Sequence, residues 1–201
     1  MPVVTTRAKK PQVRLAPEVR RRQIIDEATR LISRAGFNAV SLTDVASACG
    51  IKGPSVLHHF PSMQALLAAV LARRDEVDTM DTPVSQGGSS PEAVAAVLRN
   101  VVVRNLERRE LVRLYVVLGA EAVDPAHPAH AYFADREVSN YANLEQFLSW
   151  KRDGALAARE LMSFWTGLER QWVMNPSVDF LAVWDHFAER FFVAEERRDA
   201  A

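Results

Sequence analysis

Apolar residues recur three or four positions apart along almost the whole chain, which is the spacing of one face of an α-helix. The clearest cases are two C-terminal stretches with the same spacing: Leu161, Trp165, Leu168, Trp172 and Phe180, Trp184, Phe187, Phe191. Only 8 of the 201 residues are glycine and only 8% are aromatic, a composition that does not favour a β-sandwich. The chain is therefore expected to be all-α, with about nine helices.

Charge is distributed unevenly in a chain that is formally neutral overall. Residues 1–60 hold ten basic and four acidic side chains, so the remaining residues are acidic on balance. A basic head on an acidic body predicts a polyanion partner for the head, although charge alone leaves open a solubilising arm at residues 1–16. The single cysteine, Cys49, excludes an intramolecular disulfide framework and suits a cytoplasmic protein. No run of about 18 apolar residues is present, so no membrane partner is expected.

Turn and capping residues divide the basic region into short helices. The pattern predicts helices over 17–35, 42–48, 53–59 and 63–78. Ser41 and Asp44 have the spacing of a capping box, and Gly36 and Gly50 suit helix ends. Small residues near Gly50 allow the two short helices to cross closely. The expected arrangement is a helix-turn-helix over residues 17–62.

Two segments in this region carry a family resemblance: RRQIIDEATRLISRAGFNAVSLTDVASACGI and GPSVLHHFPSMQALLAAVLARR. Residues 21–74 resemble the DNA-binding domain of the tetracycline-repressor (TetR) family of bacterial regulators. The sequence departs from the family pattern at Leu57 and His59, where tyrosine is common, and at Met63, where lysine is usual. Leu57 and Met63 therefore lack two phosphate contacts that the family commonly makes. Contacts with the DNA phosphates are expected instead from Lys52, His58, His59 and the basic arm.

The resemblance implies a DNA-facing surface on the second short helix. Its expected members are Lys52, Gly53, Pro54, Ser55, Leu57 and His58, with His59 near the DNA backbone and Thr43 as a phosphate donor on the preceding helix. The implied partner is a double-stranded, palindromic operator bound by a homodimer. The implied function is transcriptional regulation, most often repression, with the repressor released by a ligand.

The rest of the chain, 63–201, is expected to form a connecting helix and a body for ligand binding and dimerisation. Asp81–Ser90 is predicted to be a loop, because it is rich in glycine, serine and proline. Helices are predicted over 91–107, 110–120 and 128–151, the last with Ala134, Val138, Tyr141 and Leu148 facing inward.

The aromatic stripes near the C-terminus predict a dimer seam. Both stripes are widened by further apolar residues, and a helix that is apolar on more than one side needs more than one neighbour. The family resemblance implies a four-helix interface from these helices, with Leu161, Trp165, Leu168, Trp172, Phe180, Trp184, Phe187 and Phe191. The alternative is a monomeric core.

The body lacks the sequence patterns of common enzymes, such as Gly-x-Ser-x-Gly or His-Glu-x-x-His, and no cofactor or catalytic residue is expected. A small lipophilic or aromatic effector is expected instead, in a pocket with these wall residues: Leu114, Tyr115, Leu118, Tyr141, Phe147, Met162 and Trp165. A small helical enzyme or a metal sensor is the alternative, because Glu121, Asp124, His127 and His130 recur at intervals of three. Structural capping is the preferred role of these four, so no metal site is predicted.

Overall fold

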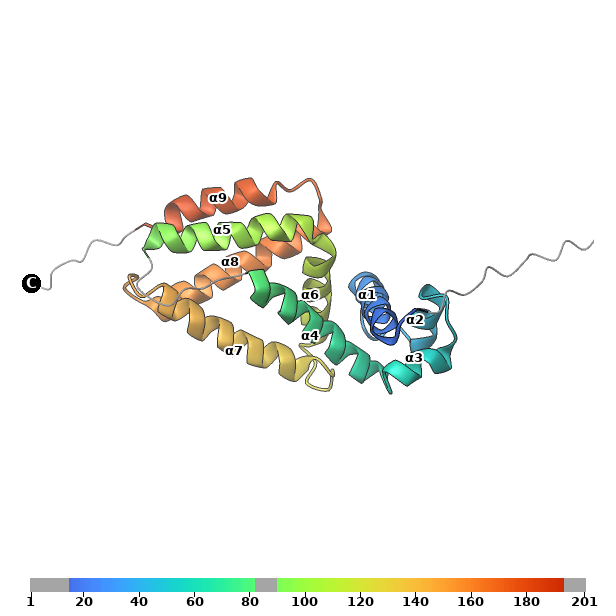
Figure 1. Cartoon of the computed structure of the whole chain (residues 1–201). Coiled ribbons are helices and arrows are strands. Elements are labelled where there is room, and N and C mark those ends of the chain that lie inside the picture. Colours follow the sequence, from blue (N-terminus) through green and yellow to red (C-terminus); the bar gives the residue numbers. More distant parts are fainter. Residues whose placement is uncertain (1–14, 82–89, 194–201) are drawn as a thin grey trace, which may run out of the picture.

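The computed structural model describes residues 15–81 and 90–193, which form nine helices and no strand (Figure 1). The N-terminal helices are α1 (Pro17–Ala35), α2 (Leu42–Ala48), α3 (Gly53–His59) and α4 (Met63–Asp81). The others are α5 (Pro91–Glu107), α6 (Arg109–Glu121), α7 (His130–Phe147), α8 (Gly154–Met174) and α9 (Phe180–Phe191). The all-α prediction is confirmed. The expected basic arm and the expected loop before α5 lie almost entirely outside the described residues.

Capping residues and glycines set the helix ends in the head. Asp44 N–H donates to Ser41 Oγ at 3.2 Å and Ser41 N–H donates to Asp44 Oδ2 at 2.9 Å, which completes the predicted capping box. Gly36 and Gly50 have φ of +85° and +65°, a region that glycine adopts without strain, and they end α1 and turn the chain after α2. The predicted helix-turn-helix is therefore confirmed, with the expected bounds for α1, α2 and α3.

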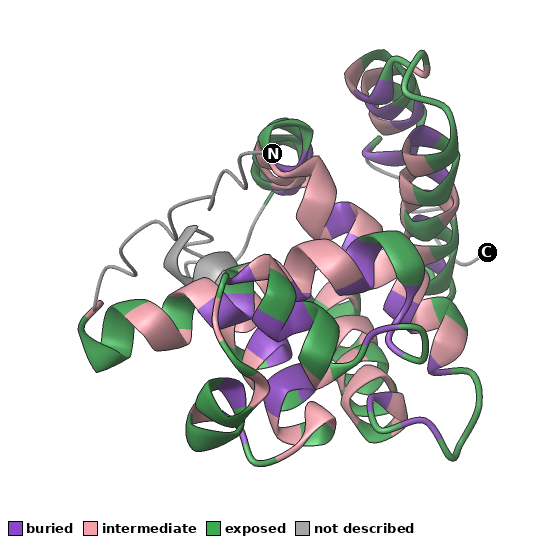
Figure 2. Cartoon of the chain, turned by 90° about the vertical axis from the view of Figure 1, so that its right-hand side faces the viewer, coloured by how far each residue is buried: buried purple, intermediate pink, exposed green. Residues whose placement is uncertain are grey.

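Two buried clusters hold the chain together. The first joins the head to α6, because Ile24 of α1 and Leu67 of α4 share a cluster with Leu114 and Leu118 of α6. The second joins α5, α6, α8 and α9, with Trp184 at its centre. In Figure 2 the buried residues lie where helices face one another, and the exposed residues lie on the outer sides. The head thus shares its core with the body, and α1 packs on α6 as its main neighbour outside the head.

Helix α7 differs from its prediction. It begins at His130 rather than at Pro128 and ends at Phe147, and Val138, predicted to face inward, is 71% exposed. Ala134 is also exposed, while Leu148 is fully buried just after the helix. None of the residues of α7, all of which are described, is fully buried. One side of α7 lines a cavity, and neither Ala134 nor Val138 is among the lining residues.

Among residues 15–81 and 90–193, no single helix has the length and hydropathy needed to span a membrane. Helix α3 and the first part of α4 meet that criterion only when taken together as a pair bent by 59°.

Candidate nucleic-acid interface and cavity

The outer face of α3 carries most of the residues predicted to contact DNA. Pro54, Ser55, Leu57 and His58 are exposed, and Leu57 is 48% exposed. The inner face is anchored by Val56 and by Phe60 just after the helix, which are 0% and 1% exposed. Because Val56 and Phe60 pack inward, the exposed side chains of α3 lie on the outer surface of the head.

The other predicted DNA contacts surround α3. Lys52 is exposed immediately before it, Gly53 is half-buried at its first position, and Thr43 is exposed in the first turn of α2. Ile51 N–H donates to Ala46 O at 2.9 Å, which holds the turn between the two helices closed. Lys52 and Thr43 are thus accessible on the surface near α3, and Gly53 is partly so.

His59 lies at the edge of this surface. Burial lowers its pKa, and the positive charges of His58 and Arg21 lower it further. Arg21 stacks its guanidinium over the Phe60 ring at 4.6 Å, which adds a cation beside the recognition helix. Apart from the general basic character of the head, no sequence pattern indicated that Arg21 would lie over Phe60. A neutral imidazole at position 59 can accept or donate a hydrogen bond but adds no charge.

A cavity of about 680 Å³ lies in the body between α5, α6, α7 and α8, with Arg74 of α4 in its wall. Five of the seven predicted pocket residues line it: Tyr115, Tyr141, Phe147, Met162 and Trp165. The other two, Leu114 and Leu118, are 0% exposed and belong to the core shared with the head. They lie one turn apart on the side of α6 that faces α1, whereas Tyr115 faces the cavity.

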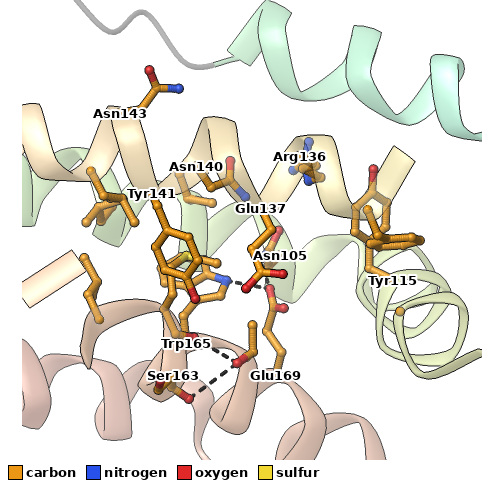
Figure 3. A pocket seen from close by; sticks show the side chains of 18 of the residues that line it. Asn105, Tyr115, Arg136, Glu137, Asn140, Tyr141, Asn143, Ser163, Trp165 and Glu169 are labelled. Carbon is orange, nitrogen blue, oxygen red and sulfur yellow. Dashed lines mark hydrogen bonds between the residues drawn. The ribbon is translucent and has the colours of Figure 1, made fainter. Parts of the chain in front are cut away.

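A carboxyl group that was not predicted stands in the cavity wall. Glu169 Oε1 accepts hydrogen bonds from Trp165 Nε1 at 2.8 Å and from Asn105 Nδ2 at 3.1 Å (Figure 3). Its surroundings remove water from the carboxylate, and this desolvation raises the pKa of Glu169 to about 7. Sequence patterns could not indicate the group, because its partners come from two helices far apart in the chain.

Polar side chains from α4, α6 and α7 meet at one end of the cavity. Two guanidinium groups lie near the Tyr115 ring, that of Arg74 at 4.9 Å and that of Arg136 at 5.1 Å from its centroid. Tyr132 hydrogen-bonds Tyr115 through their hydroxyl groups and donates to Asp75 Oδ1 at 2.7 Å. Arg136 Nη1 donates to the same oxygen at 3.2 Å. Asp75 on α4 is thus tied to α7 beside the cavity.

Comparison with known proteins supports the assignment of the head. A family model described as "Bacterial regulatory proteins, tetR family" matches residues 24–70, which run from α1 into α4. In this segment the chain matches the TetR family. It is similar to the HTH-type transcriptional repressor KstR2 of Rhodococcus jostii (strain RHA1), with 28% identity over 128 residues. That match covers 64% of this chain and 54% of KstR2, so the chain matches about half the length of this curated relative.

Solved structures of regulators have the same fold as this chain. A TetR-family transcriptional regulator from Streptomyces coelicolor superposes with a TM-score of 0.72 at 18% identity, covering 89% of this chain and 97% of the other. The fatty acid degradation regulator FadR from Bacillus halodurans has a TM-score of 0.62 at 16% identity, covering 94% of this chain and all of FadR. At these identities the likeness extends to the fold only.

The stripes expected to form a TetR-like dimer seam lie mainly inside the subunit. Trp184 is 0% exposed and Trp172 stacks on Phe180 with ring centroids 4.9 Å apart. The other buried members are Leu161, Leu168, Phe187 and Phe191. Trp165 is half-buried and lines the cavity. The buried members pack against their own helices and α5. They present almost no surface to a partner subunit, whereas the prediction placed them in the dimer interface.

The Glu121–His130 segment connects the body to the head. Phe37 N–H, at the end of α1, donates to Glu121 Oε2 at 2.8 Å, and the His127 ring packs edge-on against Phe37 with centroids 5.3 Å apart. His127 Nδ1 accepts from Ala129 N–H, and His130 Nδ1 lies 2.8 Å from Ala122 O.

The metal-sensor alternative for this segment is not supported by its geometry. Asp124 Oδ1 accepts from Ala126 N–H at 2.9 Å, and His130 is turned to a backbone carbonyl. In the part of the chain that the structure describes, no three metal-capable side chains converge. The structural role expected for the segment therefore includes a contact with the DNA-binding head that the sequence did not indicate.

Proposed function

We propose that this chain is a sequence-specific DNA-binding transcriptional regulator, a repressor that an effector releases from its operator. The observation that carries the proposal is the position of α3. Its polar and apolar side chains are presented outward on a TetR-family head whose core continues into the helix that lines the cavity. Relatives of this family are transcriptional regulators rather than enzymes, and regulation of this kind acts on DNA in the cytoplasm.

Coupling between the two sites follows from shared elements. Helix α4 carries Arg74 into the cavity wall and begins directly after the recognition helix, and α6 contacts the cavity on one side and α1 on the other. An effector that prefers one arrangement of α4 and α6 lowers DNA affinity by its difference in affinity for the two arrangements. The effector site is the cavity, with Tyr115, Tyr141, Phe147, Met162 and Trp165 in its wall.

We also propose a homodimer that binds a palindromic operator with two symmetric heads. Because the aromatic stripes are buried, the dimer contact is assigned to the exposed sides of α8 and α9. Leu156 and Met174 of α8 are 63% and 68% exposed, and Val183 of α9 is 39% exposed. Val183→Glu should weaken the dimer in sedimentation velocity, whereas Val138→Glu, on exposed α7, should leave it intact. Equal profiles for both variants would contradict this interface.

DNA binding can be tested by fluorescence anisotropy with the DNA upstream of this gene and with a scrambled duplex of equal length. We expect preference for the upstream DNA at physiological salt. Leu57→Ala should change the sequence preference, because an exposed leucine can contact a thymine methyl group. Val138→Ala, a change at another exposed aliphatic residue, should not. Equal affinity for both duplexes would refute sequence-specific regulation.

A further inference from the structure

The cavity changes in chemical character from one end to the other. Along α5, Leu98 and Val101 are followed by Arg104 and Asn105. Along α8, Leu161 and Met162 are followed by Glu169 and Arg170, and α7 runs in the opposite sense. On α7 the polar lining residues Arg136, Glu137 and Asn140 precede Leu144 and Phe147.

Contacts between helices show that these polar ends coincide. Asn105 of α5 donates to Glu169 of α8 at 3.1 Å, and the charges of Arg74 and Arg136 act on the same Glu169 carboxyl group. Figure 3 shows Arg136, Glu137, Asn105 and Glu169 together, with Tyr141 on the other side of the view from Tyr115. The cavity therefore has one polar end, and the rest of its wall is mostly apolar or aromatic.

The polar end carries an excess of positive charge. Among the described lining residues, four arginines (Arg74, Arg104, Arg136 and Arg170) face two carboxyl groups, Glu137 and Glu169. Because the pKa of Glu169 is about 7, that carboxyl group is only partly ionised at neutral pH. Asp75, outside the lining, balances part of the charge of Arg136.

The two guanidinium groups near Tyr115, those of Arg74 and Arg136, are the strongest candidates for ligand contacts. Burial lowers the pKa of Arg74, and the nearby charge of Arg136 lowers it further. An anion close to both guanidinium groups would be attracted by their positive charge, because an opposite charge within a few ångströms stabilises a buried ion. A guanidinium also presents paired donors that suit the two oxygens of a carboxylate.

We propose that the effector is an amphipathic carboxylate, which binds its acid group to Arg74 and Arg136 and places its apolar body along Leu144, Phe147 and Met162. This inference rests on the proposed function, since it names the chemical class of the effector. A cavity of about 680 Å³ has the size of sites for drug-sized molecules, so the apolar body is larger than a short aliphatic chain.

Binding of the acid group to Arg74 and Arg136 explains how such an effector acts on the head. Arg136 binds Asp75 of α4, and Arg74 precedes Asp75 on that helix. A carboxylate bound to both arginines competes with Asp75 for the guanidinium of Arg136 and changes the position of Arg74. It therefore changes the attachment of α4, the helix that follows the recognition helix.

The test compares acids with their neutral amides. The probes are dodecanoate with dodecanamide and naphthalene-2-acetate with its amide, titrated below any micelle concentration and followed by calorimetry. We expect at least one acid to bind about tenfold or more tightly than its amide, and to lower operator affinity. Arg136→Gln should remove most of this preference, while Arg190→Gln, which removes an exposed charge from α9, should preserve it.

Arg136→Lys provides a second measure, because it keeps the positive charge and should retain part of the preference for the acid. Thermal melts of each variant show whether it is folded. Equal binding of acid and amide, tighter binding of the amides, or no binding of either acid would overturn the assignment. These results would leave operator binding intact, whereas failure of the proposed function appears as equal affinity for operator and scrambled DNA without any probe.

Discussion

Replacing Glu169 by glutamine should change the pH dependence of stability. The wild-type carboxyl group has a pKa raised from an ordinary 4.5 to about 7 by desolvation. Between these two values the folded state holds more protons than the unfolded state, so the free energy of unfolding falls as pH rises through this window. Glutamine resembles the protonated carboxyl group and can accept the same hydrogen bonds from Trp165 and Asn105. The free energy of unfolding of the variant should therefore not fall in this pH window.

The size of the effect follows from the pKa difference. Each pKa unit corresponds to about 1.4 kcal/mol, so ionisation of Glu169 costs the folded state about 3 kcal/mol above pH 7. For a chain of this length, 1 kcal/mol shifts the melting temperature by roughly 2–4 °C. Glu169→Gln should thus melt roughly 6–12 °C above the wild type at pH 8, and close to it near pH 4.5.

The assay is thermal and urea unfolding at several pH values between 4.5 and 8.5, followed by circular dichroism. The matched control is Glu160→Gln, an exposed glutamate of the same helix, which should follow the wild-type curve. A constant difference between Glu169→Gln and wild type at all pH values would refute the reasoning, because it would show that the carboxyl group titrates alike in both states.

Three further changes test the head, the core and their junction. Lys52→Ala should weaken binding to specific and random DNA alike and lower the salt slope by about one in anisotropy titrations; altered sequence preference at an unchanged slope would contradict a phosphate contact. Trp184→Ala should cost about 3–5 kcal/mol in urea unfolding, because the side chain is 0% exposed within one subunit; a weaker dimer with unchanged unfolding would place it at the interface instead. Gly36→Ala should lower unfolding stability by about 1–3 kcal/mol, since φ is +85° and an added Cβ would lie 2.4 Å from Glu121 Oε1. Unchanged stability of that variant would show that the junction adjusts freely.

The architecture of the head could be read from residues that act over a few positions. Ser41 and Asp44 satisfy each other's backbone groups within one turn, and Gly36 and Gly50 allow positive φ wherever they stand. Such effects depend little on the rest of the fold. For this reason the bounds of the first three helices agree with the sequence predictions.

The aromatic periodicity near the C-terminus indicated helices but could not indicate what they contact. A stripe that includes Trp184 has the same spacing whether it faces its own subunit or a partner, and only the packing of α5 and α9 shows that it is internal. Likewise, Val138 has the spacing of an inward residue, yet it is 71% exposed and is not among the residues of α7 that line the cavity.

The charged groups of the cavity and the junction depended entirely on tertiary structure. Glu169 acquires its raised pKa from water excluded by surrounding helices, and its Asn105 partner is 64 residues away. Glu121 meets Phe37 across 84 residues. Helix bounds follow from interactions between near neighbours in sequence. Burial and electrostatic environment instead depend on which distant segments come together, and a single sequence contains no local pattern for that.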